Sequence, residues 1–326
     1  MSEKEKTKYT NNDLITMQNW SLERKIQVSL TRISEFGLKM NNKIYNSFSG
    51  GKDSTVLLDL VRRVFPDCPA VFIDTGLEYP ELRDFVKTID NVVWLKPEMN
   101  FKKVIETYGY PIISKEISGL VEVAKHKPNG KVAQLFDPNS ERVKEKTLKY
   151  GKSWGNAYVK WENLLDAPFK VSNKCCNISK KAPAKKYEKI TGNHPFIGTM
   201  ACESKIRKNG WLQTGCNIFD SDRPKSMPLS FWTEQDILHY IKEFDLKYAP
   251  IYGEIKQDKD GKYYTTGLQR SGCVYCGFGC HLEKEPNRFQ KLKKTHPKIW
   301  NYCMKDLESG GLGMKNVLEY IGVEIE

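Results

Sequence analysis

The stretch "SFSGGKDST", from Ser47 to Thr55, follows a short apolar run and precedes a helical pattern. Gly50 and Gly51 would let the backbone approach an anion, and the N–H groups of the following helix would point at it. Lys52 adds a positive charge, and Asp53 among phosphate ligands is typical of a site that also binds Mg²⁺. The hydroxyl donors of this stretch are Ser47, Ser49, Ser54 and Thr55. The sequence predicts a phosphate-binding loop whose spacing differs from the Walker A and dinucleotide patterns.

Nine cysteines supply a second kind of chemistry. Cys175 and Cys176 are adjacent, and Cys273 and Cys276 form a C-x-x-C pair far along the chain. Four thiolates in this pattern could hold an iron–sulfur cluster or zinc, and the spacing alone leaves both open. Six lysines between residues 174 and 189 make the surroundings of the first pair electropositive, which favours thiolates. The remaining cysteines divide into substitute ligands or active thiols, Cys280 and Cys303, and expected buried thiols, Cys68, Cys202 and Cys216.

The elements that must position these groups alternate between strand and helix. Apolar strands are predicted in "NKIYNSF", "PAVFIDTG" and "NVVWLKP", and helices in "DSTVLLDLVRRVF", "PELRDFVKTI" and "FKKVIETYG". This alternation indicates βαβ units and a Rossmann-like parallel sheet of the α/β class. We expect an N-terminal helical segment at 1–42, the main domain at 43–250 with a helical insertion at about 125–170, and a cysteine-rich, basic segment at 251–326.

The overall composition indicates which kinds of partner the chain favours. The chain has 326 residues, 39% hydrophobic content and a net charge of +12, so it is long enough for a full core and favours anionic partners. No apolar run approaches the length of about 20 residues that a membrane helix needs. We therefore expect a cytoplasmic protein with no membrane association, and a homodimer stays open.

Several stretches together resemble one family. "SGGKDS" resembles the pyrophosphate (PP) loop of the ATP pyrophosphatases, and the order of the further motifs resembles the phosphoadenosine-phosphosulfate (PAPS) reductase family within that superfamily. The further motifs are "FIDTGLEYPE", "GYPIISKE", "IGTMACESKIRK", "PLSFWTEQDILHYI" and "GLQRSGCVYCGF". The resemblance covers roughly residues 43–278. It implies that ATP would contact, besides the loop, the residues Asp74, Thr75, Gly76, Gly198, Arg207 and Arg270.

The same resemblance bears on the cysteines. Adenylyl-sulfate reductases of this family bind a [4Fe-4S] cluster through an adjacent cysteine pair and a distant C-x-x-C pair. It therefore implies a [4Fe-4S] cluster here, held by Cys175, Cys176, Cys273 and Cys276, with zinc as the alternative.

Two departures from the family pattern shape the functional expectation. The reductases end in a mobile tail that supplies a catalytic cysteine, whereas no cysteine follows Cys303 here, and Met200 stands where the family has an arginine. The glycine loop is complete, as in relatives that split ATP. We expect an ATP-dependent enzyme in which Lys52 and Asp53 act on the phosphates and an acceptor is adenylated and thiolated, with sulfur delivered either at the cluster or by Cys280 or Cys303 as the active thiol.

The acceptor would be a small molecule or a nucleic acid, and a separate sulfur or electron donor is required. The alternatives are a sulfonucleotide reductase that releases sulfite, and a non-catalytic regulatory module that binds nucleotide and cluster.

Overall fold

The computed structural model describes residues 7–326, which form two compact units. Unit 1 comprises residues 7–74, 78–96 and 183–272, and unit 2 comprises residues 75–77, 97–182 and 273–326. The phosphate loop belongs to unit 1, and the four predicted cluster cysteines belong to unit 2.

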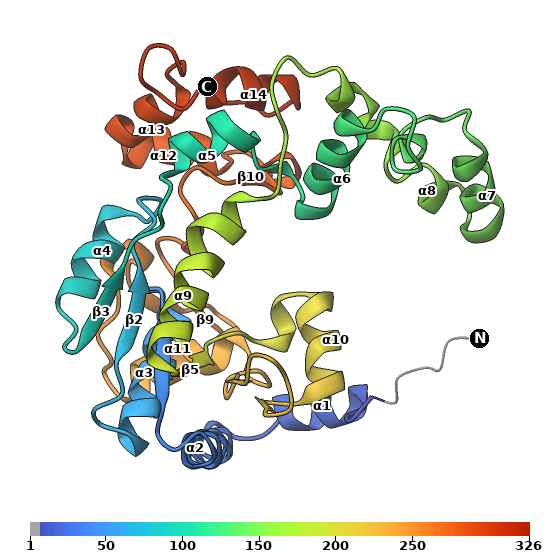
Figure 1. Ribbon diagram of the computed structural model, residues 1–326. Helices are drawn as coiled ribbons and strands as arrows, with labels where there is room; N and C mark the ends of the chain where they lie inside the picture. The colour runs from blue at the N-terminus through green and yellow to red at the C-terminus, as the bar shows by residue number, and fades with distance from the viewer. Residues whose placement is uncertain (1–6) are drawn as a thin grey trace. The chain divides into compact units, whose positions relative to one another are not determined.

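Unit 1 contains a six-stranded sheet in the order β3-β2-β1-β5-β7-β6. Figure 1 labels three of these strands, β3, β2 and β5. Its strands are β1 (Ile44–Phe48), β2 (Ala70–Ile73), β3 (Val92–Leu95), β5 (His194–Ile197), β6 (Asn217–Ile218) and β7 (Lys225–Ser226). All neighbouring pairs are parallel except β6 and β7. Asn46 is paired with Ala70 on one side and Phe196 on the other, so β1 is a central strand. The expected α/β class with a parallel sheet is confirmed.

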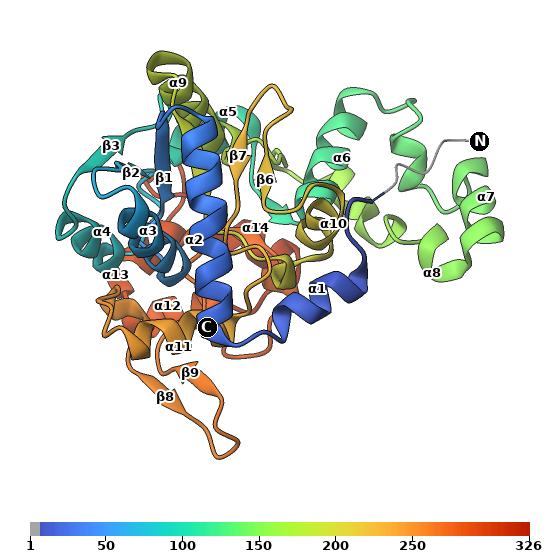
Figure 2. The same cartoon turned by 90° about the horizontal axis from the view of Figure 1, so that it is seen from below.

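Helices cover this sheet because their apolar faces pack against it. The long α2 (Leu22–Lys39) packs on α3 (Lys52–Val64) and β7, and α3 packs on β1 and β5 (Figure 2). Val56, Leu57 and Leu60 of α3 are fully buried in this core. The other elements of unit 1 are α1 (Asn11–Gln18), α4 (Pro80–Lys87), α9 (Ala182–Thr191), α10 (Lys205–Thr214), α11 (Glu234–Glu243), β8 (Ile255–Gln257) and β9 (Tyr263–Thr265).

A buried ion pair ties α2 to the start of α11. Lys25 is 1% exposed, and its Nζ lies 2.7 Å from each carboxylate oxygen of Asp236. Asp236 also accepts the Thr233 N–H and hydroxyl in a capping box, which fixes the N-terminus of α11. Trp232 and Tyr240 are both fully buried in the core of unit 1.

Unit 2 is mostly helical. Its helices are α5 (Phe101–Tyr108), α6 (Lys115–His126), α7 (Glu141–Tyr150), α8 (Lys152–Gly155), α12 (Arg288–Thr295), α13 (Pro297–Met304) and α14 (Met314–Tyr320). Its short strands β4 (Ile112–Ile113) and β10 (Gly277–Phe278) are parallel, although they come from distant parts of the sequence. This pairing holds the C-x-x-C segment in the unit. Within residues 7–326, no helix combines the length and apolar character needed to cross a bilayer.

Candidate functional site

The glycine loop connects β1 to α3 and has the geometry expected of an anion site. Gly50 has a φ of +72°, a left-handed conformation that glycine adopts without strain. Gly51 is the N-cap residue of α3 and has no side chain with which to cap the helix. The N–H groups of the first helical turn are therefore not occupied by the residue that usually caps them, and the positive end of the helix dipole lies at the loop.

Hydroxyl groups hold the loop in shape. Ser54 Oγ donates to the Gly51 carbonyl at 2.8 Å and accepts the Ser49 N–H at 3.2 Å, while Thr55 Oγ1 donates to the same carbonyl at 3.1 Å. Ser54 and Thr55 are buried, whereas Ser49 is exposed. Ser54 and Thr55 thus stabilise the turn, and the Ser49 hydroxyl takes part in the same network: its Oγ accepts the Gly51 N–H at 3.3 Å and lies 3.1 Å from Ser54 Oγ.

Lys52 is the central charge of the site. It is 3% exposed, and its Nζ lies 2.9 Å from Asp53 Oδ1 and 3.2 Å from Glu234 Oε1. The ammonium also lies 5.9 Å from the ring centre of Tyr252. Burial alone would lower the pKa of Lys52, but Asp53 and Glu234 outweigh it and raise that pKa above its usual value. The lysine therefore keeps its charge although its side chain is buried.

Two further segments of unit 1 border the loop closely. A Cβ at Gly198, just beyond β5, would lie 3.3 Å from the Asp53 carbonyl oxygen, so only a glycine leaves that approach unstrained. A Cβ at Gly51 would lie 3.1 Å from the hydroxyl of Tyr252, which is hydrogen-bonded to Ser271 Oγ at 2.5 Å. Gly198 thus lies at the loop, as the sequence predicts, whereas Tyr252 and Ser271 were not anticipated.

The two predicted arginines meet at one carboxylate. Arg207 forms an ion pair with Glu203, and Arg270 Nη2 lies 3.4 Å from Glu203 Oε1. Glu203 is anchored by the Met200 N–H at 2.7 Å. Burial lowers the pKa of Arg207, and the positive charge of the neighbouring Arg270 lowers it further. Two guanidinium groups share one carboxylate, so this cluster carries an excess positive charge that suits an anionic ligand.

The residues expected after β2 are divided between the units. Asp74 lies in unit 1, is 7% exposed, and accepts a hydrogen bond from Arg83 Nη2 at 2.7 Å. Thr75 and Gly76 fall in unit 2, where Thr75 Oγ1 accepts the Leu77 N–H at 3.2 Å. Ser47 lies within β1, paired with Val71 and Ile197.

Cys202 differs from the expectation of a buried thiol, because the structure exposes it. Its Sγ lies 3.5 Å from the Trp232 carbonyl oxygen. Partial burial raises the pKa of Cys202; Arg270 opposes this shift, whereas Asp53 and Glu234 add to it. The Cys202 thiol is therefore within electrostatic range of the charged residues of the loop. Cys68 and Cys216 are buried, as predicted.

Glu203 and Glu234 are two further residues that contact the predicted site residues and that sequence reasoning missed. Both lie inside recognisable motifs, "ACES" and "FWTEQD", so their positions were visible although their partners were not.

In unit 2 the four predicted ligand cysteines influence one another. The Cys175 thiol donates to Cys176 Sγ at 3.9 Å. This contact lowers the pKa of Cys176 to about 5, with Lys115 and Lys180 acting in the same direction against burial. The same contact and burial raise the pKa of Cys175, and the charges of Cys276 and Cys273 add to the rise. The two pairs therefore lie within electrostatic reach of each other.

The donor set fits an iron–sulfur cluster in type and number. Among residues 7–326, no group of three or more His, Cys, Asp or Glu side chains is gathered tightly enough to hold a metal ion. Four thiols are donors of a type that either an iron–sulfur cluster or zinc takes, so both alternatives from the sequence stay open.

Cys280 and Cys303 are both buried. Cys280 is 1% exposed, its Sγ donates to the Gly277 carbonyl at 3.0 Å, and burial raises its pKa to about 11. Cys303 is fully buried, and burial raises its pKa as well. A raised pKa keeps both thiols protonated near neutral pH, which disfavours them as nucleophiles in this conformation.

A mostly parallel sheet with helices packed on it and a glycine loop at the carboxyl end of a central strand defines the class of this protein as open-sheet α/β. The model of the phosphoadenosine phosphosulfate reductase domain matches residues 43–114 and 116–281. The chain therefore belongs to the phosphoadenosine phosphosulfate reductase family.

Individual relatives agree with this assignment. An adenosine 5'-phosphosulfate reductase of Halalkalibacterium halodurans is 31% identical over 264 residues, covering 79% of this chain and 83% of the relative. An uncharacterized protein of Methanocaldococcus jannaschii is 26% identical over 305 residues, which is 91% of this chain and 55% of the relative. A second protein of that organism is 22% identical, and the chain spans 41% of it. The chain thus spans about half the length of these two relatives.

Among solved structures, the phosphate complex of phosphoadenylyl-sulfate reductase from Candida auris aligns with 78% of this chain and 97% of its own, at 17% identity and a TM-score of 0.38.

Proposed function

We propose that the chain binds ATP with Mg²⁺ at the glycine loop, adenylates an oxygen atom of an acceptor with release of pyrophosphate, and supports replacement of that oxygen by sulfur. The observation that carries this proposal is the complete loop: Gly50 is left-handed, Gly51 begins α3, and the charged Lys52 is buried directly behind them. A loop of this kind suits a chain of phosphates, because backbone N–H groups and a fixed cation act on them together.

Each loop residue has a role in this proposal. Gly50 and Gly51 let the β- and γ-phosphates approach the backbone, and Lys52 compensates their charge. Asp53, whose side chain is 26% exposed, and Glu234, at 43%, are carboxylates that could bind Mg²⁺ together with phosphate oxygens. Protein sites for Mg²⁺ usually contribute only one or two carboxylates, so this donor set fits the ion.

The arginine pair supports a second anionic contact. Arg207 and Arg270 share Glu203, so their excess charge is available to a phosphate of the nucleotide or to an acidic group of the acceptor.

The proposed chemistry needs no net oxidation. An acceptor oxygen forms a bond to the α-phosphorus while the bond from that phosphorus to the leaving pyrophosphate breaks, and the electron pair departs with pyrophosphate. A donor at the oxidation level of sulfide then forms a carbon–sulfur bond while the carbon–oxygen bond breaks, and AMP leaves with the oxygen. Fixed positive charge at the loop would stabilise the leaving pyrophosphate.

A [4Fe-4S] cluster would be held by Cys175, Cys176, Cys273 and Cys276. When bound, it would supply a site at which sulfide-level sulfur is coordinated or electrons are passed. The burial of Cys280 and Cys303 supports a sulfur donor outside these two thiols, which favours delivery at the cluster over the other alternative from the sequence.

Release of AMP and pyrophosphate tests the proposal directly. The protein is purified without oxygen and incubated with Mg·ATP, sulfide and a panel of carbonyl-containing metabolites and short RNAs. We expect acceptor-dependent pyrophosphate release that falls about a hundredfold in Lys52→Ala, because a preorganised charge is lost. Lys87→Ala is the matched control, since Lys87 is exposed on α4. Undiminished release in Lys52→Ala would remove the role given to the loop.

A second candidate function is reduction of adenosine 5'-phosphosulfate. It is favoured by the relatives that bear the name of this reductase, one of them 31% identical. Sulfite formation from adenosine 5'-phosphosulfate and thioredoxin, with no pyrophosphate from ATP, would support this function in place of the first.

A further inference from the structure

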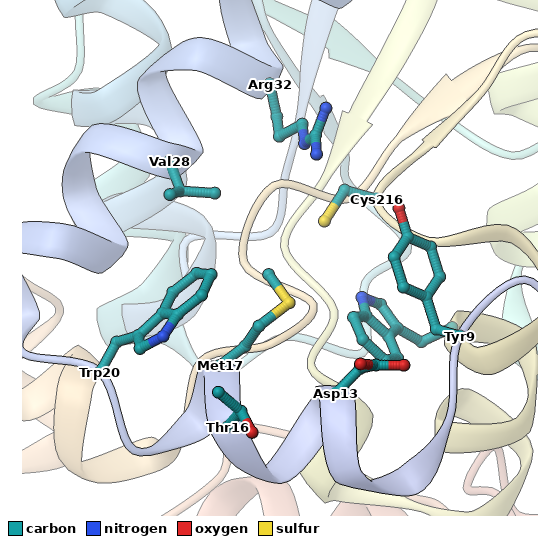
Figure 3. Close-up of a pocket in the computed structure, with 9 residues that line it drawn as sticks. Tyr9, Asp13, Thr16, Met17, Trp20, Val28, Arg32 and Cys216 are labelled. Atoms are coloured by element: carbon teal, nitrogen blue, oxygen red, sulfur yellow. The ribbon is translucent and has the colours of Figure 1, made fainter.

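A cavity in unit 1 lies away from the residues of the glycine loop. It has a volume of about 380 Å³ and lies where α1, α2 and the segment around Trp211 and Cys216 come together (Figure 3). Its wall is mainly apolar and aromatic, and its size falls within the range of small-molecule pockets. None of the residues that line it contributes to the phosphate loop or to the arginine cluster.

One buried donor of this cavity lacks an oxygen or nitrogen acceptor. The side chain of Trp211 is 2% exposed, and its indole N–H faces the Cys216 sulfur, a weak acceptor; within residues 7–326 the indole Nε1 makes no hydrogen bond of ordinary length. A buried N–H group without an acceptor is unfavourable, and most such groups in folded proteins are satisfied by protein, water or ligand. A bound molecule with an acceptor atom would satisfy this donor.

Two further hydrogen-bond donors, Arg32 and Tyr9, lie at the end of the cavity where Cys216 is found. Figure 3 shows the guanidinium of Arg32 and the hydroxyl end of Tyr9 directed toward Cys216. Burial raises the pKa of the Cys216 thiol, while Ser230, Trp211 and Arg32 act in the opposite direction, so the indole and the guanidinium both lie near this sulfur. Arg32 binds Glu35 through Nη1 at 3.0 Å, and a guanidinium carries five N–H donors in total.

The opposite part of the cavity suits a flat apolar body. Met17, Trp20 and Val28 line it, and Trp20 is held in place by an edge contact with Phe231 at 6.0 Å. Asp13 also lines the cavity, but its carboxylate accepts the Thr10 N–H and hydroxyl in the capping box of α1. This carboxylate therefore already serves the start of α1.

We propose that this cavity binds a small aromatic carboxylic acid. The ring would lie among Met17, Trp20 and Val28, and the carboxylate would accept hydrogen bonds from Arg32 and the Trp211 indole. Aromatic side chains supply contact area for a flat ring, and a guanidinium binds a carboxylate with two parallel hydrogen bonds. The site is independent of the proposed ATP chemistry.

The probes are 2-naphthoate and its neutral analogue 2-naphthamide, titrated into the full chain with ¹⁵N-labelled tryptophan. The seven tryptophans give separate indole N–H signals, and loss of one signal in Trp211→Phe assigns it. We expect a saturable shift of the Trp211 signal with 2-naphthoate. Arg32→Gln should weaken 2-naphthoate binding about tenfold and change 2-naphthamide binding by less than about twofold, because only the former carries the charge.

Matched variants distinguish binding in this cavity from binding elsewhere on the chain. Lys39→Gln removes a positive charge from the last residue of the same helix, which does not line the cavity, and should leave 2-naphthoate binding unchanged. Val28→Phe fills the cavity while keeping every polar donor, so it should abolish binding even where Trp211→Phe is poorly folded. Saturating ATP should not compete. Absence of a saturable Trp211 shift, equal affinity in Arg32→Gln, or competition by ATP would each overturn the proposal.

Discussion

Lys52 and Glu234 form an ion pair with 3.2 Å between Nζ and Oε1, although they belong to two helices far apart in the sequence, α3 and α11. The pair connects the glycine loop to the motif "FWTEQD". A carboxylate and a phosphate would compete for the same ammonium, so the loop without nucleotide is held by its own acidic residues.

Removing this carboxylate should strengthen nucleotide binding. With ADP in the absence of Mg²⁺, we expect Glu234→Gln to bind about two- to fivefold more tightly, because a half-exposed ion pair is worth at most about 1 kcal/mol. Calorimetric titration measures the change. Glu243→Gln, at the other end of α11, should bind like the unmodified chain. Weaker binding in Glu234→Gln would instead make Glu234 part of the nucleotide site.

The backbone of the loop should limit substitution at Gly50. Its φ of +72° and a Cβ position 2.8 Å from Val86 Cγ2 predict that Gly50→Ala lowers the free energy of unfolding by more than the cost of a left-handed alanine, about 1–2 kcal/mol. Gly261 has a φ of +76° with no neighbour within 4 Å, so Gly261→Ala reports the backbone cost alone. Urea unfolding of both variants gives the comparison. Equal destabilisation would show that contact with Val86 costs nothing.

Gly51 should respond differently. It is not left-handed, but a Cβ there would lie 3.1 Å from the Tyr252 hydroxyl and occupy the loop. We expect Gly51→Ala to keep most of its stability and to bind ATP at least about tenfold more weakly, because backbone approach is blocked. Full ATP affinity in this variant would argue against phosphate binding over Gly51.

The exposed Cys202 should report on nucleotide binding. Its raised pKa predicts that alkylation by iodoacetamide is slow at neutral pH and accelerates as the pH rises above the ordinary thiol pKa, since the thiolate reacts. Saturating Mg·ATP should slow the labelling of Cys202, as measured by mass spectrometry of peptides. The buried Cys216 and Cys303 should stay unlabelled in the folded chain. Unchanged labelling of Cys202 with bound ATP would place the nucleotide elsewhere.

Iron content should distinguish the cysteines of unit 2 that bind the cluster from those that do not. After anaerobic purification we expect about four irons per chain, with iron lost when Cys175, Cys176, Cys273 or Cys276 is replaced by serine. Cys303→Ser should retain iron, because the family resemblance implies four other cysteines as the ligands and Cys303 is a candidate only as a substitute; loss of iron in this variant would make Cys303 a ligand. Zinc in place of iron would select the alternative that the spacing leaves open.

Much of the fold follows from local sequence patterns. The short apolar runs predict β1, β2 and β3, and the amphipathic segments between them predict α3 and α4, because strand and helix periodicities are local properties. Pairs that join distant segments escape such reasoning. The parallel pairing of β4 with β10 depends on two-residue strands that carry no periodic signal.

The candidate site likewise combines features that the local sequence predicts with features that depend on contacts between distant residues. The sequence by itself determined the loop, because glycine, lysine and hydroxyl residues at that spacing have a direct physical meaning at a βα turn. Only the tertiary structure decided that Glu234 binds Lys52, that Arg207 and Arg270 share Glu203, and that Cys202 is exposed. Charges and burial depend on which distant residues become neighbours, and the fold alone brings those residues together.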